Sequence, residues 1–228
     1  MKALVLSSGG VDSTTALGMA VAQYGKENVI ALSVSYGQKH DKELQAAAKV
    51  AAFYGVEHLS LDLAKIFQYS NCSLLQQSTE NIPEESYAEQ LQKTGGTVPV
   101  STYVPFRNGL FLSSAASIAL SKDCGVIYYG AHADDAAGFA YPDCSCAFTD
   151  AMNTAIYEGS GHQLRIEAPF VHWTKAQVVK KGLELGVPYE LTWSCYEGGE
   201  KPCGKCGTCI DRAKAFAENG VKDPALEE

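Results

Sequence analysis

The stretch Ser7-Ser8-Gly9-Gly10-Val11-Asp12-Ser13 decides the fold, because it stands between an apolar run and a helical pattern. Residues 2–7 form a strand candidate, and residues 12–24 place Leu17 and Val21 on one helix face. The paired glycines let the backbone turn tightly and bring N–H groups close to a ligand. A helix start adds unpaired N–H groups and a partial positive charge. This strand–turn–helix unit predicts a site for pyrophosphate.

The side chains of the same stretch support this prediction. Ser8, Ser13, Thr14 and Thr15 supply hydroxyl donors. Asp12 would repel a phosphate, so it either caps the helix or helps to hold a Mg²⁺ ion that bridges the phosphates. The string lacks the lysine of the Walker loop and the spacing of the dinucleotide-binding loop. An ordinary strand–turn–helix corner with a capping aspartate is the simpler alternative.

Strand and helix patterns alternate on either side of this unit. Further strands are expected at 29–35, 56–61, 126–130 and 165–168, and helices at 41–54, 108–122, 143–157, 174–185 and 210–217. Such alternation predicts an α/β fold with a doubly wound parallel sheet. Residues 68–99 are rich in polar residues and contain Gly95-Gly96, so they are expected to be a long loop or lid.

Composition restricts the class of protein. The chain has 228 residues, 46% of them hydrophobic, which suits one globular domain with a small appendage. Its formal net charge of −8 and the lack of a basic run disfavour direct binding of nucleic acid. No apolar run approaches the ~20 residues of a membrane span, and the first residues do not resemble a signal peptide. We therefore expect a cytoplasmic protein without membrane contact.

Half of the cysteines cluster near the carboxyl end. Cys195, Cys203, Cys206 and Cys209 provide thiolates, and glycines between the last three allow the turns that aim sulfurs at one point. The cluster predicts a metal site. A structural zinc ion and an iron–sulfur cluster use the same ligands. The expected organisation is a nucleotide-binding domain over 1–190 and a metal segment with a short helix over 191–228.

Two further stretches are candidates for substrate binding. Arg107 precedes a helix and carries a planar fork of donors that fits a carboxylate or a phosphate. Asn108 beside it either caps the helix or binds a ligand. Asp134 follows a strand at its carboxyl end, where open α/β sheets bind ligands. It could hold Mg²⁺, accept from an amino group, or be a plain surface charge.

Asp143 and the segment after the second strand complete the set. Asp143 could accept from the ring N–H and amine of a guanine-like edge, or cap the next helix. Lys39 or His40 could reach a nucleotide, because they follow a strand at the sheet edge that carries residues 7–13, called the phosphate loop below. Either side chain could equally be exposed.

These strings, in this order, resemble the 7-cyano-7-deazaguanine synthase family of the queuosine pathway, within the PP-loop ATP pyrophosphatases. The resemblance runs from residue 7 to about residue 212. It is carried by Ser8-Gly9-Gly10-Val11-Asp12-Ser13-Thr14-Thr15, Tyr36-Gly37-Gln38-Lys39-His40, Thr102-Tyr103-Val104-Pro105-Phe106-Arg107-Asn108, Tyr141-Pro142-Asp143-Cys144, Glu167-Ala168-Pro169 and Thr192-Trp193-Ser194-Cys195-Tyr196.

The resemblance implies ATP-dependent conversion of 7-carboxy-7-deazaguanine and ammonia into the 7-nitrile, through an adenylated carboxylate and an amide. It implies ATP, Mg²⁺ and a zinc ion on the four cysteines, and it favours a homodimer. The implied ATP site comprises Ser7, Ser8, Gly9, Gly10, Val11, Asp12, Ser13, Thr14, Thr15, Ala16, Leu17 and Lys39. The implied catalytic residues are Asp12, Ser13, Arg107 and Asp134, and the implied substrate-binding residues are Arg107, Asn108, Asp134 and Asp143.

Other functions remain open at this point. A related PP-loop enzyme could adenylate another carboxylate or transfer a deazaguanine to a protein. A zinc-stabilised nucleotide-binding module without catalysis is the alternative from a different class.

Overall fold

The computed structural model describes residues 1–226, and its centre is a parallel sheet of five strands in the order β3-β2-β1-β4-β5. The strands are β1 (Lys2–Leu6), β2 (Val29–Ser35), β3 (Glu57–Asp62), β4 (Cys124–Tyr128) and β5 (Arg165–Glu167). The chain adds β2 and β3 on one side of β1 and then returns to add β4 and β5 on the other side. The predicted doubly wound parallel sheet is confirmed.

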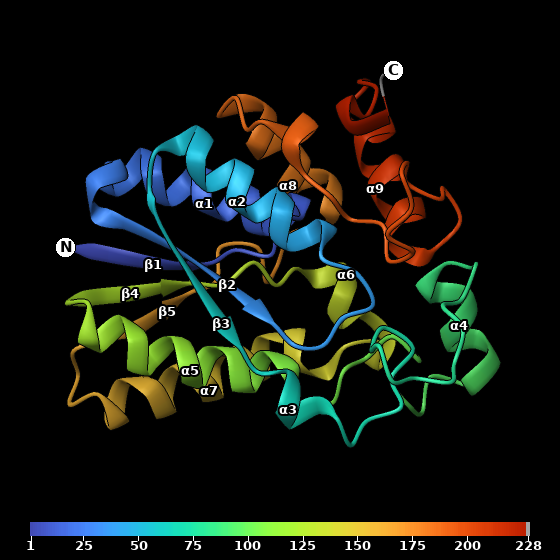
Figure 1. Cartoon of the computed structure of the whole chain (residues 1–228), viewed down its shortest axis with the longest axis horizontal. Coiled ribbons are helices and arrows are strands. Elements are labelled where there is room, and N and C mark those ends of the chain that lie inside the picture. Colours follow the sequence, from blue (N-terminus) through green and yellow to red (C-terminus); the bar gives the residue numbers. More distant parts are fainter. Residues whose placement is uncertain (227–228) are drawn as a thin grey trace.

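Helices cover both faces of this sheet (Figure 1). On one face lie α1 (Val11–Tyr24), α2 (Lys42–Tyr54) and α8 (Lys175–Glu184), and on the other lie α5 (Arg107–Ser121) and α7 (Cys146–Gly159). Successive side chains of β1 point to opposite faces. Leu4 accordingly belongs to the core under α5, while Ala3 and Val5 belong to the core under α1.

Smaller elements gather at the carboxyl ends of the strands (Figure 1). They include α4 (Tyr87–Thr94), α6 (Ala133–Ala136) and α9 (Gly207–Glu218), while α3 (Ala64–Phe67) follows β3. Short 3-10 turns occupy 26–28, 137–139, 142–144, 189–191 and 224–226. No helix among residues 1–226 is long and apolar enough to cross a membrane.

The segment 68–99 differs from the expected loop, because it contains helix α4. Ser86 caps this helix: its side chain accepts from the Glu89 N–H, and the Glu89 carboxylate accepts from the Ser86 N–H. This reciprocal pair is a capping box, which satisfies two of the free donors at a helix start. The Ser-x-x-Glu spacing was the sequence signal for the helix.

A buried ion pair holds the carboxyl-terminal segment together. The Arg212 guanidinium donates to both carboxylate oxygens of Asp223, at 2.6 and 2.8 Å, and also to the Thr192 hydroxyl at 2.8 Å. The backbone N–H of Trp193 donates to the Gly9 carbonyl at 2.9 Å. The segment therefore packs directly on the loop that follows β1.

Candidate active site

The loop between β1 and α1 forms the floor of a cavity at the carboxyl ends of the strands. Gly9 has a φ of +83°, and a Cβ atom there would lie 2.3 Å from the Glu43 carbonyl oxygen and 2.5 Å from the Ala47 nitrogen. Only glycine permits this approach of α2 to the loop. The N-cap residue of α1 is Gly10, and no side chain caps this end. The first N–H groups of α1 are thus available to an anionic ligand.

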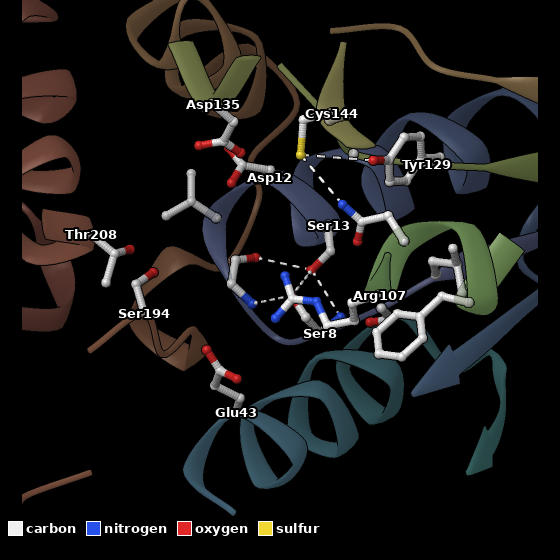
Figure 2. A pocket seen from close by; sticks show the side chains of 18 of the residues that line it. Ser8, Asp12, Ser13, Glu43, Arg107, Tyr129, Asp135, Cys144, Ser194 and Thr208 are labelled. Atoms are coloured by element: carbon white, nitrogen blue, oxygen red, sulfur yellow. Dashed lines mark hydrogen bonds between the residues drawn. The ribbon is translucent and has the colours of Figure 1, made fainter. Parts of the chain in front are cut away.

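Two serines fix the shape of this loop. The Ser8 N–H donates to the Ser13 Oγ at 3.1 Å, and the two hydroxyl oxygens lie 3.0 Å apart (Figure 2). The loop residues that line the cavity are Ser7, Ser8, Gly10, Val11, Asp12 and Ser13. The cavity lies beside both β1 and the end of β4, where the strand order reverses, and open α/β sheets bind ligands at such a point.

The remaining residues of the predicted ATP set do not line the cavity. Thr15 is buried on the far side of α1, where its hydroxyl donates to the Val11 carbonyl and contacts the Tyr189 hydroxyl at 2.7 Å. Gly9 and Thr14 are also outside the lining, and Ala16 and Leu17 are core residues. The Lys39 ammonium donates to the Glu80 carbonyl at 3.0 Å. For residues 14–17 the reason is the direction of α1, because only its first turn faces the sheet edge.

Charged groups gather beside the first turn of α1. The Asp12 carboxylate accepts a hydrogen bond from the Lys175 ammonium, and its other oxygen lies 3.8 Å from His132 Nε2. His132 is 2% exposed and lies 3.3 Å from the Asp135 carboxylate. Burial would raise the pKa of Asp12, but Lys175 and His132 outweigh it and lower that pKa. Burial would lower the pKa of Lys175, but Asp12 and Asp135 raise it overall. Both groups are therefore charged at neutral pH.

Asp135 lines the cavity, whereas the predicted Asp134 does not. The Asp134 carboxylate accepts from the Lys175 backbone N–H at 2.7 Å, at the start of α8. Lys175 and His132 were missed by the sequence reasoning. Thr174 caps α8, and the first turn after a cap that follows a strand faces the ligand edge of the sheet. That placement was the available signal for Lys175.

Arg107 lines the opposite part of the cavity. Its guanidinium carbon lies 4.9 Å from the centre of the Tyr36 ring and 5.8 Å from that of Phe111. Such stacking orients the planar group and leaves its N–H donors available in the plane. Arg107 therefore has the geometry of an anchor for a carboxylate or phosphate.

Asn108 and Asp143 hold the start of α5 in place. The Asp143 carboxylate accepts from the Asn108 backbone N–H at 2.9 Å, and the Asn108 amide lies 3.3 Å from the Cys144 sulfur. Burial raises the pKa of Asp143, which is only 3% exposed. Asn108 lines the cavity and Asp143 does not. The alternative that Asp143 caps the next helix is wrong, because Ser145 caps α7 and the Asp143 carboxylate accepts from the first turn of α5.

Tyrosines from distant segments close the cavity. The Tyr87 hydroxyl of α4 lies 2.8 Å from the Tyr196 hydroxyl, and both residues line the cavity. A Cβ atom on Gly207, between two of the clustered cysteines, would lie 2.7 Å from the Tyr87 ring. The segment 68–99 and the cysteine segment therefore meet over the cavity.

The four cysteines of the carboxyl-terminal segment come together as predicted. The Sγ atoms of Cys195, Cys203, Cys206 and Cys209 all lie within 4.8 Å of one another. Cys195 Sγ accepts from the Cys203 N–H at 3.3 Å, and Cys203 Sγ accepts from the Cys206 N–H at 3.4 Å. Backbone donors stabilise thiolates, and four thiolates at this spacing fit a tetrahedral metal ion. The cluster is suited to metal binding.

Relatives named 7-cyano-7-deazaguanine synthase make this chain an ATP-dependent carbon–nitrogen ligase of the PP-loop class. Its loop after β1 lies at the strand reversal and faces charged groups in one cavity. The sequence profile described as "Queuosine biosynthesis protein QueC" matches residues 2–220. The chain belongs to the QueC family.

Relatives and a solved structure agree with this assignment. The chain is 44% identical to the 7-cyano-7-deazaguanine synthase of Archaeoglobus fulgidus over 100% of this chain and 91% of that protein. It is 43% identical to the same synthase from Caldicellulosiruptor bescii over 98% of this chain and 96% of that protein. A structure of NMN synthetase from Francisella tularensis has a TM-score of 0.51 at 16% identity, covering 97% of this chain and 78% of that chain. That likeness concerns the fold alone.

Proposed function

We propose that this protein converts 7-carboxy-7-deazaguanine, ammonia and ATP into 7-cyano-7-deazaguanine. The observation that carries the proposal is one cavity that combines the phosphate loop with Arg107 on another wall. This arrangement suits a reaction between a polyphosphate and a second anion. The names of the full-length relatives supply the identity of the product.

The chemistry must first make a carboxylate electrophilic. Attack of the carboxylate oxygen on the α-phosphorus of ATP releases pyrophosphate and forms an acyl adenylate. Ammonia then displaces AMP to give the amide, with loss of a proton. The amide oxygen attacks the α-phosphorus of a second ATP and releases a second pyrophosphate. Loss of AMP and of both amide protons from that adenylate yields the nitrile. No covalent bond to the protein is needed.

The chain supplies positioning and charge for these steps. The first N–H groups of α1, with Ser8 and Ser13, would hold the leaving pyrophosphate. Lys175 would neutralise phosphate charge from the opposite side, while Arg107 holds the carboxylate and later the amide oxygen. Preorganised donors of this kind stabilise developing charge without reorganisation. Asp12 holds Lys175 in position and is expected to be required for turnover.

Mg²⁺ would fit beside Asp12 and Asp135, because Asp12 Oδ1 is buried without a hydrogen bond and both carboxylates flank His132. When bound, the ion would neutralise phosphate charge. Zinc would fit the four cysteines, and four protein ligands leave no open position for a substrate. We assign that metal a structural role.

The proposal is tested by mass spectrometry of the products formed from the acid, ATP and ¹⁵N-ammonium. The nitrile containing ¹⁵N, together with AMP, is expected. An amide end product would point to a related adenylating ligase. A deazaguanine adduct on a protein would indicate the transferase alternative, and unaltered ATP in the presence of all substrates would favour a nucleotide-binding module.

A further inference from the structure

Glu43 lies in the first turn of α2 and lines the same cavity as the phosphate loop. Figure 2 shows its side chain rising from α2 into the cavity, on the side opposite to Asp12 and Asp135. The close approach of α2 to Gly9 fixes the backbone at this position, since the Glu43 carbonyl packs directly on that glycine. The carboxylate is therefore presented to a ligand by a rigid element.

The Glu43 carboxylate makes no hydrogen bond or ion pair with the protein within residues 1–226, unlike most acidic groups around it. Asp12 accepts from Lys175, Asp134 from the Lys175 N–H, and Asp143 from the Asn108 N–H. Asp135 lies 3.3 Å from His132 Nε2, and Lys175 acts electrostatically on Asp211. The carboxylate oxygens of Glu43 can therefore accept hydrogen bonds from a ligand, at the end of the cavity that lies away from Asp12 and Asp135.

The surroundings of Glu43 define the shape of that ligand. Arg107 acts electrostatically on Glu43 without pairing with it, and Tyr36 beneath Arg107 is part of the same wall. Tyr36, Phe111, Trp193 and Tyr196 bring aromatic rings to the cavity. Aromatic walls favour a flat ring system. A carboxylate can accept two parallel hydrogen bonds from adjacent N–H groups in the plane of such a ring.

We propose that Glu43 is the specificity-determining residue of this cavity, and that it accepts two hydrogen bonds from a ring N–H and the adjacent exocyclic amine of a planar heterocycle. This inference rests on the proposed function, in which the heterocycle is the deazaguanine acid. Arg107 would hold the carboxyl group of the same molecule. Glu43 thereby takes the role expected for Asp143, whose carboxylate is occupied by Asn108.

The test compares two ligands on two proteins. The ligands are 7-carboxy-7-deazaguanine and its analogue that lacks the exocyclic amine. The proteins are the full-length enzyme and Glu43→Gln, which retains the shape of the side chain but offers only one acceptor oxygen. Dissociation constants are measured by calorimetry, with ATP as an independent ligand and Asp41→Asn, an exposed carboxylate beside α2, as the matched control.

The wild-type enzyme should bind the acid about 10- to 100-fold more tightly than the analogue, as expected for hydrogen bonds to a charged acceptor. Glu43→Gln should weaken binding of the acid by a similar factor and lose most of the discrimination, while its ATP affinity stays unchanged. Asp41→Asn should behave as wild type.

Equal binding of acid and analogue by the wild type would overturn the assignment. So would a variant with undiminished discrimination, or one altered only in its KM for ammonium. Failure of the wild-type enzyme to bind or turn over the deazaguanine acid would instead reject the proposed function. The two failures are therefore distinguishable.

Discussion

The Lys175 ammonium donates a hydrogen bond to the Asp12 carboxylate, which joins the first turn of α8 to the first turn of α1. The side chains are 13% and 21% exposed. Removing one partner of such a pair leaves a largely buried charge uncompensated. The contact thus couples the stability of the domain to the geometry of the loop after β1.

We expect Lys175→Met to lower stability by about 3 kcal/mol, the lower part of the range for breaking a buried ion pair. It should also lower kcat/KM by about 100-fold or more, the typical effect of losing one preorganised charge donor. Chemical denaturation and pyrophosphate release measure the two effects. Lys180→Met, on an exposed position of the same helix, is the control and should change neither. Wild-type turnover in Lys175→Met would contradict the role given to this lysine.

Gly9→Ala should disrupt both the loop and the packing of α2. The added Cβ would lie 2.3 Å from a backbone oxygen that cannot move independently of α2. Gly220→Ala is a matched control, because its φ of +71° is similar but nothing lies within 4 Å of the added atom. The control should lose about 1–2 kcal/mol from the backbone conformation alone. Gly9→Ala should lose clearly more and fail to bind ATP, as measured by thermal denaturation and calorimetry. Equal losses would show that the α2 contact is unimportant.

Removal of the metal with a strong chelator should weaken ligand binding. Trp193, Ser194, Tyr196, Thr208 and Asp211 line the cavity from the cysteine segment. Metal binding energy in such segments is folding energy. The apoprotein should therefore show a lower melting temperature, faster proteolysis after residue 190 and weaker ATP binding, all reversed by added zinc. Elemental analysis of the purified protein identifies the resident metal. Unchanged ligand affinity in verified apoprotein would contradict this coupling.

The pH dependence of stability should carry a contribution from Glu43. Burial raises its pKa from 4.5 to about 7, although Arg107 opposes the change. The folded protein then binds this proton more tightly than the unfolded chain. This difference contributes at most about 3 kcal/mol to the free energy of unfolding. The contribution is complete below about pH 4.5 and is lost as the pH rises through about 7. Glu43→Gln should gain stability relative to wild type between pH 5 and pH 8 in denaturation curves. A difference that is constant with pH would contradict the raised pKa.

The sequence was sufficient for the sheet, the phosphate loop and the cysteine cluster. Each of these features is a local pattern. Periodicity predicts the strand–turn–helix unit, and four cysteines within 15 residues are typical of a metal site. The sequence also placed Arg107 at the start of a helix, which α5 confirms. Helix α4 was missed, although its capping box is visible at Ser86 and Glu89.

The remaining site residues depend on contacts distant in sequence. Lys175 is 163 residues from Asp12, and no local pattern relates the two. Asp134 and Asp135 are adjacent, and only the short helix α6 determines which of them faces the cavity. Glu43 lies in an ordinary amphipathic helix, so its orientation toward the cavity follows from the packing of α2 on Gly9. The tertiary structure, and not the residue type, therefore decides which of these side chains face the cavity.

In the proposed reaction the loop after β1 directs cleavage of ATP between its α- and β-phosphates during activation of a carboxylate. The most direct measurement follows AMP and pyrophosphate by ³¹P NMR, with the deazaguanine acid and ammonium present or omitted in turn. We expect AMP and pyrophosphate to appear in equal amounts and only when the acid is present. Formation of ADP and phosphate, or cleavage of ATP that does not depend on the acid, would contradict the account.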